Sequence, residues 1–252
     1  MDTKSRALLI DVKRCIGCRA CVAACKQAHG FPGGDEDTKL SATAYTALVD
    51  KSDDVHVRSL CMHCLTPSCA SVCPVGALQK TAAGPVEYDA ARCLGCRYCM
   101  VACPWSVPRY EWKALAPSVR KCDFCRERLE KGEAPACVEA CPVEATVIGT
   151  REELLAEAHR RIAEDPQGYH PHVYGETEAG GTSVLFLSPV PFEALGFRQG
   201  LGSEPLPGLT WQALEKIPGV VTIGGTALYA VWWITHRREE VARAAQEAGH
   251  AR

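Results

Sequence analysis

The sequence predicts an α+β fold in which a duplicated, cysteine-rich body is followed by one hydrophobic helix near the C-terminus. Three observations support this prediction. The 252 residues include sixteen cysteines, which fall into four tight groups. The spacing of these groups repeats along the chain, and residues 218–235 form an uncharged stretch of helical length.

The composition limits the possible functions. A net charge of -2 argues against a nucleic-acid-binding surface, and 47% hydrophobic residues are enough for a core. Cysteines separated by two other residues are poorly placed to form a disulfide with each other and well placed to bind a metal. A disulfide scaffold is therefore disfavoured.

The most informative stretch is Cys93–Pro104, a complete C-x2-C-x2-C-x3-C-P pattern. Bacterial-type ferredoxins use this spacing to ligate [4Fe-4S] clusters. The first three thiolates hold one cluster, and the fourth, followed by proline, ligates a neighbouring one. The fold class is therefore predicted as α+β with duplicated ferredoxin-like dicluster domains and one C-terminal transmembrane helix.

The four groups are related in pairs. Cys15–Cys25 and Cys93–Cys103 share the pattern D-x2-R-C-x-G-C-R-x-C-x2-A-C, counted from Asp11 and Asp89. The groups Cys61–Pro74 and Cys122–Pro142 share C-x2-C, a variable gap and C-x3-C-P-V-x-A. Such a repeat predicts two interleaved dicluster units within residues 1–150.

Sixteen cysteines supply four clusters with four ligands each. We expect the second and third groups to exchange their fourth cysteines, and the first and fourth groups to do the same. The predicted ligand sets are set 1 (Cys15, Cys18, Cys21, Cys141), set 2 (Cys122, Cys125, Cys137, Cys25), set 3 (Cys61, Cys64, Cys69, Cys103) and set 4 (Cys93, Cys96, Cys99, Cys73).

Zinc is the alternative occupant, because C-x2-C pairs also occur in zinc ribbons. Zinc sites do not need three cysteines at two-residue spacing or a proline after the fourth. His63 lies inside a group that already has four cysteines, so we expect it beside a cluster rather than as a ligand. Four arginines flank the predicted ligands: Arg14, Arg19, Arg92 and Arg97. Positive charge at these positions would favour the reduced cluster. The alternative is that they are ordinary solvated arginines.

The remaining chain predicts two further segments. Residues 151–208 are expected to form a helix, opened by a capping box at Thr150 and Glu153, a strand at 182–187 and an extended arm that binds a partner. Strands are also expected at 7–10 and 44–49, and His170 and His172 are expected to face solvent. The last segment, residues 209–252, is expected to form a transmembrane helix with a short tail.

The membrane prediction rests on residues 218–235. Eighteen residues at 1.5 Å rise span roughly 27 Å, close to the thickness of a hydrocarbon core. Tyr229, Trp232 and Trp233 lie near one end, and His236-Arg237-Arg238 follow. A buried helix of a soluble protein is the alternative. The positive charge after the helix predicts a cytoplasmic C-terminus and a cysteine-rich body on the opposite face.

We find no residues predicted to make or break covalent bonds. There is no nucleophile with an adjacent base, phosphate-binding glycine loop or dinucleotide fingerprint in the sequence, so no catalytic residues are predicted.

The cysteine pattern of residues 7–149 resembles that of the four-cluster iron–sulfur (beta) subunits of the dimethyl sulfoxide reductase superfamily. Gly149–Glu153 and Gly180–Thr182, with a single C-terminal helix, resemble the beta subunit of membrane-bound formate dehydrogenases. Val190–Glu193 and Leu195-Gly196 resemble the matching hydrogenase-2-type subunit.

This resemblance implies an electron-transfer subunit. Electrons would pass from a catalytic subunit, of the molybdopterin type, through four [4Fe-4S] clusters to an integral membrane subunit that reduces quinone. The subunit would lie at the inner membrane as a single-pass protein in contact with lipid, with its cluster domain on the periplasmic face; the cytoplasmic face is the alternative. Residues 1–6 contain no signal segment, so we expect export with a signal-bearing partner, which favours the formate dehydrogenase type. A nickel–iron hydrogenase, another molybdopterin oxidoreductase and a zinc-binding structural protein remain alternatives.

Overall fold

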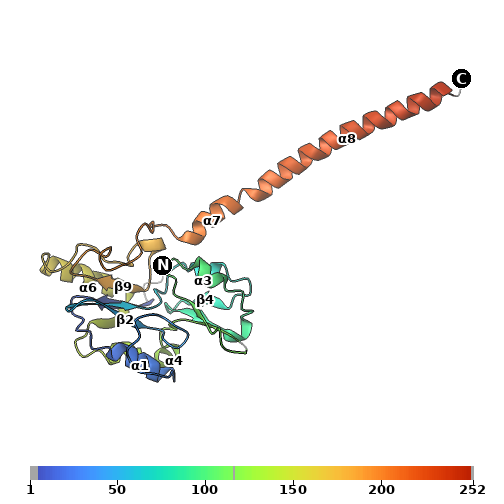
Figure 1. Cartoon of the computed structure of the whole chain (residues 1–252). Coiled ribbons are helices and arrows are strands. Elements are labelled where there is room, and N and C mark those ends of the chain that lie inside the picture. Colours follow the sequence, from blue (N-terminus) through green and yellow to red (C-terminus); the bar gives the residue numbers. More distant parts are fainter. Residues whose placement is uncertain (1–4, 116, 251–252) are drawn as a thin grey trace. The chain divides into compact units, whose positions relative to one another are not determined.

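The computed structural model describes residues 5–115 and 117–250. The chain divides into two units, residues 1–207 and residues 208–252, each of which is described separately. Figure 1 follows the chain from the N-terminal cysteine groups in blue to the long C-terminal helix in red.

A three-stranded sheet forms the centre of the first unit. Its middle strand is β1 (Arg6–Asp11), flanked by β8 (Thr146–Thr150) on one side and β9 (Val184–Leu187) on the other. β1 pairs antiparallel with β8 and parallel with β9. The sheet therefore joins the N-terminal strand to segments that lie before and after helix α6 (Arg151–Glu164) in the sequence.

The two faces of β1 contribute to different hydrophobic cores, because side chains alternate along a strand. Leu8 and Ile10 pack in a core that includes Phe124, from the fourth cysteine group. Ala7 and Leu9 pack in a second core on the opposite face. All four β1 side chains are buried, which explains why this strand has an unbroken apolar sequence.

Helix α6 (Arg151–Glu164) covers the second core (Figure 1). It begins with the predicted capping box, since the Thr150 hydroxyl accepts the Glu153 N–H and the Glu153 carboxylate accepts the Thr150 N–H. Leu154 and Ala158 are buried against the sheet. The predicted helix and its capping box are confirmed.

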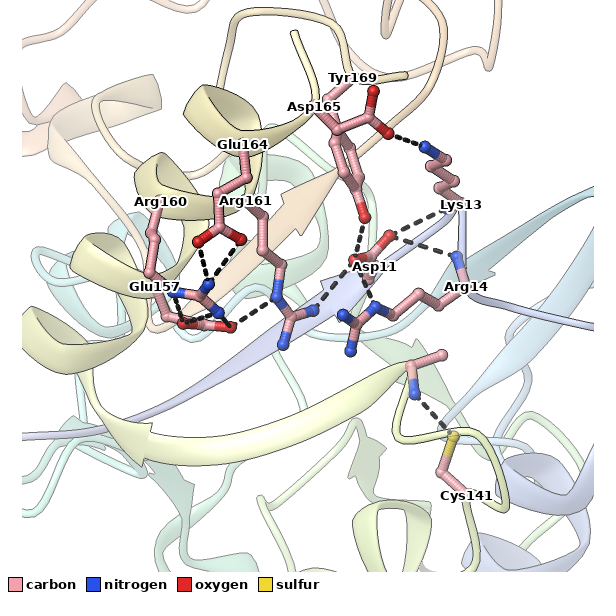
Figure 2. A network of polar contacts seen from close by, with 11 residues as sticks. Asp11, Lys13, Arg14, Cys141, Glu157, Arg160, Arg161, Glu164, Asp165 and Tyr169 are labelled. Atoms are coloured by element: carbon pink, nitrogen blue, oxygen red, sulfur yellow. Dashed lines mark hydrogen bonds and ion pairs between the residues drawn. The ribbon is translucent and has the colours of Figure 1, made fainter. Parts of the chain in front are cut away.

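A buried ionic network connects α6 to the cysteine-rich part (Figure 2). The Asp11 carboxylate, 0% exposed, accepts hydrogen bonds from Arg161 Nη1 at 3.0 Å and the Tyr169 hydroxyl at 2.8 Å. The Asp11 N–H donates to the carbonyl of Ala145 at 2.7 Å, and the Ala145 N–H donates to Cys141 Sγ at 3.2 Å. Asp11 thus fixes the position of the turn that carries Cys141.

The cysteine groups lie among short elements at two ends of this unit (Figure 1). The helices α1 and α5 of the first and fourth groups contact each other, as do α2 and α3 of the second and third groups. The short helices are α1 (Ala20–Ala28), α2 (Ser68–Ser71), η1 (Ala90–Arg92), α3 (Tyr98–Ala102), α4 (Arg126–Glu130), α5 (Ala136–Glu139) and η2 (Glu178–Gly180). The two-stranded sheets are β2–β3 (Ala47–Ser52 and Val55–Ser59), β4–β5 (Leu78–Lys80 and Val86–Tyr88) and β6–β7 (Arg109–Tyr110 and Val119–Arg120).

Three local predictions need correction. The strand expected at 44–49 begins at Ala47 instead, because pairing with β3 sets its register. The extended arm expected at the end of the segment 151–208 also packs on its own chain, since Phe192 and Leu195 are buried in the core. His170 and His172 are half-buried against Phe192, and His172 Nε2 lies 2.6 Å from the Glu178 carboxylate.

The second unit is helical. α7 (Leu206–Leu214) precedes α8 (Ile217–His250), which contains the predicted stretch 218–235 and continues beyond it. Large apolar side chains are exposed along α8, Val220 by 70% and Leu228 by 73%. Within the described residues, Leu206–Gln246 is the one helical segment long and apolar enough to cross a membrane. Such a helix needs lipid or another apolar surface around it.

Candidate iron–sulfur sites

All four C-x2-C turns share one backbone feature. The residue before the second cysteine has a positive φ in each: Gly17 (68°), His63 (48°), Gly95 (75°) and Phe124 (66°). Such a conformation is rare for residues other than glycine. It turns backbone N–H groups toward sulfur, as where Gly95 N–H donates to Cys93 Sγ at 3.4 Å and Phe124 N–H donates to Cys122 Sγ at 3.4 Å. The turns are thus built to present thiolates.

The three Cys-Pro turns share a second geometry. The sulfurs of Cys73, Cys103 and Cys141 each accept the N–H of the residue four positions later, at 3.2, 3.5 and 3.2 Å respectively. Proline after the cysteine ends any helix and so permits this turn. Cys25 lacks the proline and lies inside α1, where its sulfur is 3.9 Å from His29 Nδ1 instead.

Cys25 is accompanied by a charged histidine. His29 Nε2 lies 3.0 Å from the Asp123 carboxylate, and its Nδ1 lies 2.8 Å from the Cys25 carbonyl. Burial disfavours the imidazolium, but these hydrogen bonds outweigh burial and raise the pKa of His29 to about 10. The first and fourth groups are therefore linked by a cation beside their cysteines.

Two of the predicted sets each line one cavity. Cys15, Cys18, Cys21 and Cys141 share a cavity with Arg58 and Thr146. Cys73, Cys93, Cys96 and Cys99 share another, closed by Leu78, Tyr88 and Val119. In both, the fourth cysteine comes from a different group than the first three.

In the other two predicted sets, the thiols influence one another's pKa values. Burial raises the pKa of Cys64 well above its ordinary value, and Cys61, Cys69 and Cys103 raise it further. Burial likewise raises the pKa of Cys125 to about 12, with added effects from Cys137 and Cys25. The four cysteines of set 3 therefore lie near one another, and so do Cys25, Cys125 and Cys137 of set 2.

The electrostatic influences that thiols of one set exert on the pKa of thiols in another follow a single order. The Cys21 thiol of set 1 is influenced by Cys137 of set 2, and Cys122 of set 2 by Cys61 of set 3. Cys69 of set 3 is influenced by Cys99 of set 4. The four sets therefore succeed one another as 1, 2, 3 and 4.

These sites fit iron–sulfur clusters better than a set of free thiols. Four buried thiols at one point resist ionisation, because each new thiolate repels the others in a medium of low dielectric constant. A bound metal removes this cost by supplying positive charge. All sixteen cysteines lie within the described residues and are free, so none is used in a disulfide.

Comparisons with known proteins agree with this geometry. Two family models, each described as a 4Fe-4S dicluster domain, match residues 14–77 and 54–151. The hydrogenase-2 operon protein HybA of Escherichia coli O157:H7 is 39% identical over 236 residues, covering 76% of this chain and 72% of that protein. The chain belongs to the 4Fe-4S dicluster iron–sulfur subunits. This iron–sulfur subunit is also 36% identical over 199 residues to the iron–sulfur subunit of nitrate-inducible formate dehydrogenase of E. coli K12, covering 72% and 67% of the two chains.

A third relative extends the similarity along the chain. A protein of Nitratidesulfovibrio vulgaris is 42% identical over 254 residues, covering 94% of this iron–sulfur subunit and 69% of that protein. The fold prediction of tandem dicluster domains is confirmed, and the subunit holds four [4Fe-4S] clusters and transfers electrons.

Three cations near the cysteines of this iron–sulfur subunit were not predicted from the sequence. Of the arginines singled out in the sequence, Arg19 and Arg97 do line the cavities of sets 1 and 4, where Arg19 also pairs with Asp50 and Arg97 lies over the rings of Tyr110 and Trp112. The three cations near cysteines that were not predicted are Arg58 and Lys121, which are buried, and Lys80, which is partly buried. Only Lys121 had a signal in the sequence, because it precedes a first cysteine as Arg14 and Arg92 do.

Gly17 is the most constrained glycine of these turns. A Cβ atom there would lie 2.5 Å from the His56 ring, which is held by a 2.7 Å hydrogen bond with Asp50. At the repeat position, a Cβ on Gly95 would meet only the far end of Tyr110, 2.9 Å away. Gly17→Ala is therefore expected to lower iron content and thermal stability more than Gly95→Ala. Both substitutions also cost about 1–2 kcal/mol because alanine is strained at a positive φ. Equal losses in iron assays and thermal unfolding would contradict the role of His56.

Proposed function

We propose that this subunit carries electrons through its four clusters in line, from a catalytic subunit to a quinone-reactive membrane subunit. The observation that carries this proposal is the order of the cysteine sets, in which the thiols of each set influence the pKa of thiols in a neighbouring set. A linear series brings an electron from one end of the subunit to the other in short steps.

We assign the ligands as the spacing predicts. Cluster 1 is held by Cys15, Cys18, Cys21 and Cys141, and cluster 2 by Cys122, Cys125, Cys137 and Cys25. Cluster 3 is held by Cys61, Cys64, Cys69 and Cys103, and cluster 4 by Cys93, Cys96, Cys99 and Cys73. The shared cavities of sets 1 and 4 and the mutual influence within sets 2 and 3 support this assignment.

Iron and sulfide analysis with EPR spectroscopy of the reduced protein tests the clusters. Four clusters require about sixteen iron atoms per chain. Zinc in their place, with no EPR signal, would overturn the proposal in favour of a structural metal protein.

For the catalytic partner we propose a molybdenum or tungsten subunit of the formate dehydrogenase type, in keeping with the similarity to a formate dehydrogenase subunit. A nickel–iron hydrogenase subunit is the second candidate, favoured by the longer match to HybA, 39% over 236 residues against 36% over 199. Purification of the native complex distinguishes them. Molybdenum or tungsten with formate-driven cluster reduction supports the first, and nickel with hydrogen-driven reduction supports the second.

We further propose that α8 anchors the subunit in the inner membrane, in contact with lipid and with the quinone-reactive subunit. The exposed apolar surface of α8 and the bases at 236–238 support this placement, with the cluster domain on the periplasmic face. Protease treatment of sealed inverted vesicles tests the side, since a periplasmic cluster domain is protected there and a cytoplasmic one is cleaved.

Truncation tests the anchor itself. Removal of residues 208–252 is expected to release the subunit from membranes with its iron content unchanged, because the two units are separate and all cysteines lie in the first. The measurement is sedimentation with membranes in cells that lack the partner subunits. Unchanged sedimentation of the truncated chain would show that α8 is not the anchor.

A further inference from the structure

Arg58 is a buried cation held by neutral groups. It lies on β3 and is 4% exposed. Its Nε donates to the Thr46 hydroxyl at 2.8 Å, and its Nη1 donates to the Thr146 hydroxyl at 3.1 Å. These bonds come from the segment before β2 and from the start of β8, so the guanidinium is fixed from two sides.

Arg58 has no acidic partner among the residues that the structure describes, where none of the ion pairs involves it. The contrast with Arg161, another buried arginine, is clear, because Arg161 pairs with both Asp11 and Glu157. A buried charge without a counter-ion costs several kcal/mol. An anion must therefore compensate Arg58.

Sulfur provides the negative charge around it. Arg58 lines the cavity formed by Cys15, Cys18, Cys21 and Cys141. Burial by itself would lower the pKa of Arg58, but the nearby sulfurs of Cys137 and Cys21 outweigh burial and raise it. Arg58 thus lines the cavity of set 1 and lies near Cys137 of set 2.

We propose that Arg58 is the counter-ion shared by clusters 1 and 2, and that it raises the reduction potentials of both. The proposal rests on the ligand assignment above. Each cluster becomes more negative by one charge when it accepts an electron from its neighbour or from the catalytic subunit. A fixed cation beside it stabilises the reduced state more than the oxidised one. Because the cation is shared, it also reduces the repulsion between the two clusters when both are reduced.

The effect is confined to one half of the series. The cations beside set 3 are Lys80 and Lys121, whose charges act on Cys61, Cys64 and Cys69. Arg58 is therefore expected to govern two of four redox transitions and to leave the other two unchanged.

The test uses two matched pairs in the full-length, cluster-loaded subunit, with EPR-monitored redox titration as the readout. Thr146→Asp places a carboxylate on the same guanidinium, while Thr146→Asn has the same shape without the charge. Arg58→Gln removes the cation, and Arg58→Lys retains it. Arg160→Gln, on the exposed face of α6, is the control for loss of a distant cation.

Thr146→Asp is expected to lower the potentials of two transitions relative to Thr146→Asn, and Arg58→Gln to lower the same two relative to Arg58→Lys. Equal reduction potentials in Thr146→Asp and Thr146→Asn would overturn the proposal. This comparison holds even if Arg58→Gln does not load clusters. An equal shift of all four transitions, or a shift in Arg160→Gln, would also overturn it. Fewer than four transitions in the unmodified subunit would instead contradict the proposed function.

Discussion

A double variant of Cys103→Ala and Cys61→Ala is expected to lose no more iron than either single variant. Both cysteines are assigned to cluster 3, so the second substitution removes a ligand from a cluster that is already lost. Each single variant should lose about a quarter of the iron. Alanine is used because serine could still ligate iron through its oxygen.

The control pair combines Cys103→Ala with Cys93→Ala. Cys93 and Cys103 belong to one sequence group, but we assign them to different clusters, so their losses should add to about half of the iron. Iron per chain and the integrated EPR signal measure both pairs. The reverse pattern, additive for Cys61 and non-additive for Cys93, would show that Cys103 closes the cluster of its own group.

Asp11→Ala is expected to destabilise the first unit by about 3–5 kcal/mol, because the buried guanidinium of Arg161 loses the carboxylate that compensates its charge. Arg161 is 8% exposed and retains only its bond to Glu157, while Tyr169 loses its acceptor. Thermal unfolding of the cluster-loaded subunit, followed by circular dichroism, measures the loss.

The repeat supplies a matched control for this variant. Asp89 holds the same place before Cys93 as Asp11 does before Cys15, but it is exposed and accepts one hydrogen bond, from the Ala91 N–H at 2.9 Å. Asp89→Ala is expected to cost about 1 kcal/mol, as for a lost cap. Equal destabilisation by the two variants would show that the buried network contributes nothing beyond local capping.

The comparison of Asp11 with Asp89 shows what the sequence could predict. The local pattern around both residues is the same, and it predicted cysteine turns at both places because spacing is a local property. The burial of Asp11 depends on Arg161 and Tyr169, which lie about 150 residues away in sequence. No local pattern encodes that contact.

The same limit explains why Arg58 was missed. Its strand has an ordinary alternating sequence, and a single arginine on a strand usually faces solvent. Its burial follows from packing against the start of β8, which is 88 residues away. Capping at Thr150 and the apolar strand β1 were predictable because their signals lie within a few residues.

The interleaving of the cysteine groups has a consequence for synthesis on the ribosome. Under the proposed assignment, clusters 3 and 4 draw every ligand from residues 61–103, so they can be completed while the rest of the chain is still being translated. Clusters 1 and 2 need Cys141 and Cys25 respectively from opposite ends of the cysteine-rich body. Cluster 1, which uses the first cysteines to be translated, therefore cannot be completed until Cys141 has been synthesised. Clusters 1 and 2 are thus expected to be assembled after clusters 3 and 4.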